Sequence, residues 1–151
     1  MHQMESQEST SEALAITRRW NPTWNSKFFM VDYLTTEIAA IEEQFPGNVA
    51  YICDFHRIQA LQWWARSKKN NLSSAKQEMF LEFMKGIGNA SYGDKIKEQV
   101  EALRKSNLYR DHETLKNYVE NTWLSCAYRW VQAFHKQQAN NIVNTKNKIE
   151  A

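Results

Sequence analysis

KFFMVDYLTTEIAAIEEQFPGNVAYICDFHR, residues 27–57, is the stretch that decides the expected fold. The apolar run at residues 28–31 is typical of a buried strand of a parallel sheet, and it ends at Asp32. Residues 35–45 repeat apolar side chains at helical spacing and stop at a Pro-Gly pair, after which residues 49–52 resume a strand. We therefore predict a strand-helix-strand unit.

The two strands of this unit are expected to end side by side. A strand-helix-strand crossover within one sheet is almost always right-handed, and its strands are parallel. Asp32 and Cys53 therefore stand at the same edge of the sheet, where α/β folds keep their sites. The second strand closes through Cys53, Asp54 and His56, and a helix is expected from about Gln59.

Composition excludes several classes of protein. The chain has 151 residues, 42% of them hydrophobic and 13% aromatic, so it can bury one core and we expect one folded domain. No apolar stretch approaches the roughly 18 to 20 residues of a membrane span, and the first residues lack the apolar core of a secretory signal. With only two cysteines, the sequence predicts an intracellular protein without a disulfide framework and without a membrane partner.

The net charge of +2 conceals opposite charges in the two halves of the chain. Up to His56, three basic residues stand against eight acidic ones, whereas from Arg57 onward sixteen basic residues stand against nine acidic ones. A basic half is compatible with a nucleic-acid partner, but lysines on solvated helix faces give the same count, and both interpretations stay open. The candidate nucleic-acid contacts are Arg57, Arg66, Lys68 and Lys69.

The remaining chain is expected to be helical between polar ends. Residues 1–11 are rich in Glu, Gln and Ser and should form a loose polar tail, and a helix should open at Ser11-Glu12 and end before a proline. Residues 58–138 carry apolar side chains at helical spacing with a polar break at 68–71, and residues 139–151 are a polar tail. The expected helix starts are Ser73 or Ser74, Asp94, and Asp111 or His112, with a division near Ser125.

Two features near the strand ends could carry chemistry. Asp32 suits a divalent metal, because Mg²⁺ prefers carboxylate oxygens, but a strand-end aspartate also caps the turn or helix that follows it. Cys53 and His56 have a zinc-like spacing, although alone they are half of a site that Cys126 or His135 would have to complete. Packing and hydrogen bonding at the sheet edge is the alternative role for this pair.

A set of motifs then suggests a family. Trp20-Asn21-Pro22 is followed by FFMVDYLTTEIAAIEEQFPG and YICDFHRIQALQWW, and later by TWLSCAYRWVQAF and VNTKNKIEA. In this order they resemble the transposase domain of Mutator-like elements in animal genomes, over a span from about Leu14 to Ala151. The family has a ribonuclease-H-like fold, a site of three carboxylates, and a helical insertion between the last two.

The resemblance implies an α/β, mostly α, partial ribonuclease-H-like fold within residues 12–151. Residues 27–57 would form a small two-stranded parallel β element, residues 58–138 a large helical insertion, and residues 139–151 a tail with the terminal glutamate. By the same resemblance, Asp32 is the second catalytic aspartate, Cys53 and His56 are the C-x-x-H signature, and Glu150 ends the T-N-N-x-x-E motif. The middle Asn of that motif is replaced here by Lys146.

A complete site would use Mg²⁺ or Mn²⁺ held by Asp32 and Glu150 to cleave DNA in the nucleus. The family's first catalytic aspartate ends an upstream strand, and no such strand is expected before Lys27. The expectation is a fragment or decayed copy of a DDE-type DNA transposase that is inactive alone. The unpaired sheet edge would then pair with a protein partner or a second copy.

Two alternatives to an inactive remnant stay open. The basic helical half would suit a domesticated module that binds DNA or protein. An active nuclease would need a second chain to supply the missing strand and aspartate.

Overall fold

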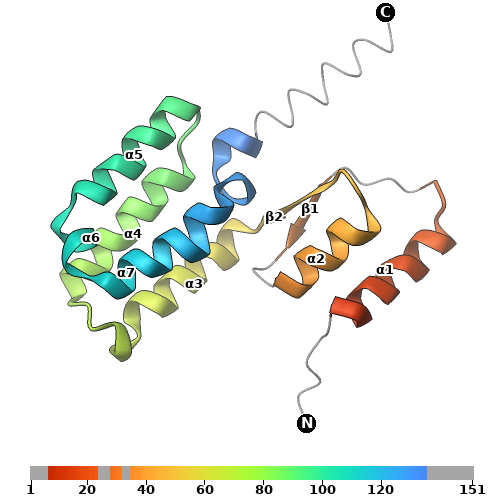
Figure 1. Cartoon of the computed structure of the whole chain (residues 1–151), viewed down its shortest axis with the longest axis horizontal. Helices are drawn as coiled ribbons and strands as arrows, with labels where there is room; N and C mark the ends of the chain where they lie inside the picture. Colours follow the sequence, from red (N-terminus) through yellow and green to blue (C-terminus); the bar gives the residue numbers. More distant parts are fainter. Residues whose placement is uncertain (1–6, 24–27, 32–34, 136–151) are drawn as a thin grey trace, which may run out of the picture. The chain divides into compact units, whose positions relative to one another are not determined.

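The structure, a computed structural model, describes residues 7–23, 28–31 and 35–135. It is mostly helical, at 78% helix, with a small two-stranded parallel sheet, which confirms the fold class at that level (Figure 1). The chain divides into two compact units, Met1–Arg57 and Ile58–Ala151. None of the helices in the described part of the chain combines the length and hydrophobicity that crossing a bilayer requires.

The first unit contains the predicted strand-helix-strand order: β1 (Phe28–Val31), α2 (Thr35–Gln44) and β2 (Val49–Ile52). The two strands pair in parallel, and their last residues, Val31 and Ile52, lie opposite each other. Gly47 turns the chain between α2 and β2 with a φ of 86°, a backbone conformation that glycine adopts at little cost. The core of this unit is a small aliphatic cluster of Val31, Ile38, Ile41 and Ala50, against which Leu14 and Phe29 pack.

Helix α1 (Gln7–Trp20) begins earlier than predicted, so the expected loose tail of residues 1–11 is wrong for residues 7–11. The reason is a contact with α2 that the local sequence does not reveal. Ser11 is buried, its hydroxyl donates to Glu43 Oε2 at 2.9 Å, and Gln44 Nε2 donates to Ser11 Oγ at 2.8 Å. These bonds hold the amino-terminal part of α1 against α2.

Helix α3 (Asp54–Arg66) also begins earlier than the predicted start at Gln59. Asp54 and His56 therefore lie in its first turn rather than at the end of the strand, which corrects the expected position of both. Asp54 favours this start because a carboxylate stabilises a helix amino terminus, and it pairs with Arg57 at 3.5 Å, one turn along.

The second unit gathers α4 (Ser74–Gly88), α5 (Gly93–Lys105), α6 (Asn107–Asp111) and α7 (Glu113–Tyr118) (Figure 1). The predicted break after α3 is confirmed as a 3₁₀ turn, Lys68–Asn70, and the predicted cap is confirmed at Ser73, whose hydroxyl accepts from the Lys76 N–H at 3.3 Å. The predicted cap at Asp94 is wrong, because α5 begins at Gly93 with Tyr92 before it.

Aromatic side chains form the core of the helical unit. Trp64 stacks on Tyr118 with ring centroids 4.4 Å apart, and Trp123 meets Trp130 edge to face at 5.9 Å. The Trp130 indole N–H donates to the carbonyl of Trp123 at 2.8 Å. This packing follows an irregular backbone, because α7 gives way to a π-helical turn and then to a 3₁₀ segment, Val119–Trp123 and Leu124–Arg129. The helical region expected from Asp111 or His112 is therefore present, but only its first part, α7, is an α-helix.

Candidate functional site

The end of the parallel sheet is the first candidate site. The N–H of Cys53 donates to the carbonyl of Val31 at 2.8 Å, so the ladder continues one residue beyond β2. Because of this bond, the carbonyl of Val31 lies beside Cys53, as expected for parallel strands joined by a crossover helix. Val31 directly precedes Asp32 and is the last described residue before it. Asp32 and Glu150, the expected catalytic and metal-binding carboxylates, lie outside the described residues, and so does the tail at 139–151.

Cys53 and His56 bracket the junction between β2 and α3. Cys53 is half-buried. Its backbone carbonyl accepts the Arg57 N–H at 2.9 Å, which is the first hydrogen bond of helix α3. The half-buried His56 ring meets Phe55 edge to face at 5.4 Å. Among the residues that the structure describes, no three His, Cys, Asp or Glu side chains are grouped to hold a metal. A metal role for this pair stays a prediction.

The structure corrects the expected role of Arg57. This residue is only 2% exposed, and its Nε lies 3.5 Å from the Asp54 carboxylate. Burial lowers the pKa of the Arg57 guanidinium from its usual value, and the charge of Asp54 offsets part of that effect. A guanidinium so enclosed does not present itself to a phosphate, so Arg57 is not a surface contact for nucleic acid.

The other three expected contacts are exposed and adjacent. Arg66 lies in the last turn of α3, and Lys68 and Lys69 lie in the 3₁₀ turn that follows it. The buried Asn70 holds this turn in place, because its Nδ2 donates to the carbonyl of Trp64 at 2.7 Å. The three cations therefore stand on an anchored backbone. We call Arg66, Lys68 and Lys69 the basic end of α3.

Trp63 adds an aromatic ring to this surface. It precedes Arg66 by three residues on α3, which places the two side chains on one face of the helix, and it is 67% exposed. Flat aromatic rings beside cations are the components from which proteins build surfaces for unpaired bases. Sequence periodicity did not separate this tryptophan from those of the core.

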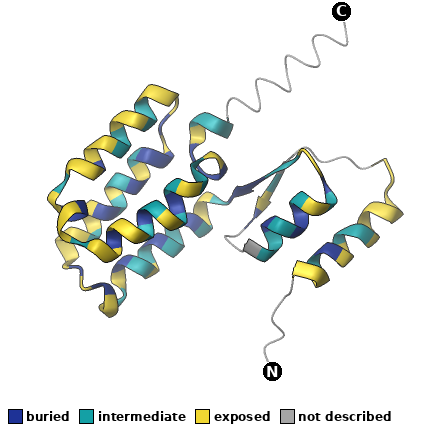
Figure 2. Cartoon of the chain, in the orientation of Figure 1, coloured by how far each residue is buried: buried dark blue, intermediate teal, exposed yellow. Residues whose placement is uncertain are grey.

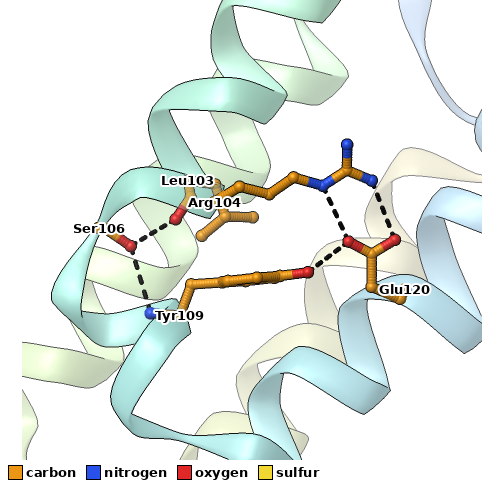
Figure 3. A network of polar contacts seen from close by, with 5 residues as sticks. All are labelled: Leu103, Arg104, Ser106, Tyr109 and Glu120. Carbon is orange, nitrogen blue, oxygen red and sulfur yellow. Dashed lines mark hydrogen bonds and ion pairs between the residues drawn. The ribbon is translucent and has the colours of Figure 1, made fainter.

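A polar network that the sequence did not predict joins α5, α6 and the π-helical turn (Figure 3). Two nitrogens of the Arg104 guanidinium donate to the Glu120 carboxylate, Nε to Oε1 at 2.9 Å and Nη2 to Oε2 at 3.0 Å. The Tyr109 hydroxyl donates to the same carboxylate. The hydrogen bond from Arg104 lowers the pKa of Glu120, and burial together with Glu120 raises the pKa of Tyr109. This network links α5, α6 and the π-helical turn, so its role is structural.

An open groove of about 700 Å³ lies between α1 and α2. Its walls include the carboxylates of Glu8, Glu12 and Glu43. Ser11 donates to Glu43 and accepts from Gln44, so these polar groups of the lining serve the packing of the two helices. We assign no ligand to it.

Comparison with known proteins adds no relative. No protein-family model matches the chain, and no curated protein or solved structure is significantly similar to it. The link to Mutator-like transposases therefore rests on the motifs of the sequence.

Proposed function

We propose that this chain is part of the catalytic domain of a Mutator-like, DDE-type DNA transposase, with a partial ribonuclease-H-like fold, and that it does not cleave DNA alone. The observation that supports the proposal is the hydrogen bond from the Cys53 N–H to the Val31 carbonyl. It brings the end of β1, where the second catalytic aspartate would follow, beside the C-x-x-H signature. Adjacent strand ends are where an α/β fold assembles a site.

In this proposal Asp32 and Glu150 supply hard anionic ligands for Mg²⁺ or Mn²⁺. When bound, such ions align the attacking water with the leaving 3′ oxygen of a phosphodiester. A third carboxylate is still required. Of the described residues before β1, Glu8 and Glu12 lie on a helix and not at the end of a strand. The first aspartate would therefore come from a segment outside those residues.

A plasmid-cleavage assay tests the inactivity of the chain alone. Incubation with supercoiled DNA and Mg²⁺ or Mn²⁺ should leave the plasmid intact. Nicking by the wild type that Asp32→Asn abolishes would contradict the proposal, because the chain would then form a working site without a further segment.

The genomic sequence upstream of Met1 tests the family assignment. A coding segment for a strand ending in aspartate is expected there. Joining that segment to this chain should produce Mn²⁺-dependent nicking that Asp32→Asn and Glu150→Gln each remove. Nicking that survives both substitutions would contradict the assigned carboxylates.

A DNA-binding module is the second candidate, and the exposed basic end of α3 favours it. From Ile58 onward fifteen basic residues stand against nine acidic ones, a net charge of +6. Exposed cations release counterions from DNA when they contact phosphates, so binding should weaken steeply with salt. DNA binding would place the protein in the nucleus.

Fluorescence anisotropy with a labelled duplex at about 50 mM salt measures this binding under conditions that favour phosphate contacts. Reversing Arg66, Lys68 and Lys69 to Glu should abolish it. The matched control reverses three exposed lysines elsewhere on the unit, Lys85, Lys97 and Lys105. Equal losses in the two variants would show an unspecific charge effect, and no binding by the wild type would exclude this candidate.

The sheet edge is the proposed site for a protein partner. Among the described residues β1 and β2 pair only with each other, so each strand presents one outer row of backbone donors and acceptors. A strand from another chain can pair with such a row.

A further inference from the structure

Helix α1 carries apolar side chains on the side that faces away from α2. Its packed side carries Ser11, which bonds to α2, and Leu14, which packs against the aliphatic cluster. Helical geometry places Ala13, Ile16 and Trp20 together on the opposite side. All three are exposed, Ile16 at 46% and Trp20 at 81%, and Figure 2 shows α1 largely in the colour of exposed residues.

A single exposed tryptophan is ordinary on a protein surface. The charges beside this apolar side are what distinguish it. Glu12 and Arg19 are exposed, lie on the same flank of α1 and are seven residues apart, which is about two helical turns. The midpoint between them falls beside Ile16. The neighbouring Arg18 is engaged elsewhere, since its Nη1 donates to the carbonyl of Gln44 at 2.6 Å.

When two copies of α1 lie antiparallel, the charged groups of one helix face groups of opposite charge on the other. We propose that α1 pairs antiparallel with α1 of a second copy of this chain, around a twofold axis that passes beside Ile16. Glu12 of each copy then faces Arg19 of the other, so one complementary pair occurs twice, as a twofold interface requires. Trp20 of each copy covers Ala13 of the other. A parallel pair would instead place Glu12 and Arg19 of the two copies on opposite flanks of the interface, where they do not meet.

The association is expected to be weak. One pair of short helices buries less than the roughly 1,200 Å² typical of a stable interface, so we expect a Kd on the order of 0.1 mM. This pairing is independent of catalysis and of DNA binding, because it uses neither the sheet end nor the basic end of α3.

Analytical ultracentrifugation of the full chain, from about a tenth to about ten times that Kd, tests the proposal. The average mass should rise from one chain toward two, and Trp20→Glu should keep the protein monomeric. Glu12→Arg and Arg19→Glu should each weaken the dimer about fivefold or more, because each creates two like-charge contacts. The double variant Glu12→Arg, Arg19→Glu should restore it.

Met30→Glu is the control, because Met30 is 59% exposed on β1 and the variant probes association through the sheet. It should leave the dimer unchanged. A protein that stays monomeric throughout would overturn the proposal, as would a dimer lost in Met30→Glu but kept in Trp20→Glu. A double variant no better than the single ones would overturn the antiparallel pairing. Circular dichroism of each variant, with the milder Trp20→Ser beside Trp20→Glu, separates lost pairing from lost helix.

Discussion

The helical unit and the strand-helix-strand unit have cores of different kinds. Ile58–Ala151 buries Trp123 and Trp130 at 1% exposure each and links them through an indole hydrogen bond. Met1–Arg57 depends on a small aliphatic cluster beneath two short strands. A helix satisfies its own backbone, whereas a two-stranded sheet leaves two edges open and is marginal by itself. The helical unit should therefore be the more stable of the two.

The two units also differ in charge. Met1–Arg57 has four basic and eight acidic residues, a net charge of −4, against +6 for Ile58–Ala151. The candidate catalytic aspartate and the candidate DNA contacts thus belong to different units. A variant in one unit can test one role without removing the other.

Trp123→Ala should have the largest effect on stability. It removes a ring that is 1% exposed and contacts Tyr118 and Trp130 edge to face, so we expect a loss of about 3–5 kcal/mol. Urea unfolding followed by circular dichroism measures it. The control Trp63→Ala removes a ring that is 67% exposed and should change stability by no more than about 0.5 kcal/mol. Similar losses in both would contradict the aromatic core.

Ile41→Ala should destabilise the first unit by about 2–4 kcal/mol, because Ile41 is 4% exposed within the aliphatic cluster. Hydrogen exchange should show faster exchange of the Cys53 amide, while the amides of α4 keep their protection. An equal loss of protection in α4 would mean that the units unfold together. Ile16→Ala, at concentrations where the chain is monomeric, is the exposed control.

Glu120→Gln should lower the free energy of unfolding by about 1 kcal/mol at pH 7. The expected loss is this small because water screens the ion pair, whose Glu120 and Arg104 side chains are 31% and 49% exposed. Because Arg104 lowers the pKa of Glu120 in the folded state, this stabilisation is complete above the unfolded value of about 4.3. The stabilisation is lost as the pH falls through the lowered pKa of Glu120 in the folded protein.

Urea unfolding at neutral and acidic pH should therefore show the difference between wild type and Glu120→Gln shrinking in acid. The exposed pair Lys105–Glu101 supplies the control, and Glu101→Gln should change stability by only a few tenths of a kcal/mol. A difference that grows in acid would contradict the role of Arg104.

Gly47→Ala should have a similarly small effect, about 1 kcal/mol, because a φ of 86° strains any residue with a Cβ although nothing lies within 4 Å of it. Gly93→Ala is its matched control in the helical unit, since its Cβ also meets nothing within 4 Å and its backbone is helical. That change should leave stability unchanged or raise it by about 0.5 kcal/mol. Thermal unfolding of both variants measures the contrast.

Several features of the fold could be predicted from neighbouring residues alone. The strands Phe28–Val31 and Val49–Ile52, the break after α3 and the cap at Ser73 all depend on apolar spacing, on turn residues or on one nearby hydroxyl. The meeting of Val31 and Cys53 followed from the parallel pairing of strands joined by a crossover helix. For the candidate site, the parallel pairing of the two strands agrees with the expected adjacency of their ends, and the roles of Asp32, Glu150 and the three exposed cations stay predictions.

Contacts between residues far apart in the sequence decided the features that local sequence did not predict. Ser11 extends α1 because it meets α2, and Glu120 binds Arg104 from sixteen residues away. Periodicity marks tryptophans as apolar, but only packing separates the buried Trp123 from the exposed Trp63. The sequence by itself determined where most of the helices and strands lie, because those signals act over one or two turns. The tertiary structure decided which side chains are buried, paired or left at the surface, because that depends on partners far along the chain.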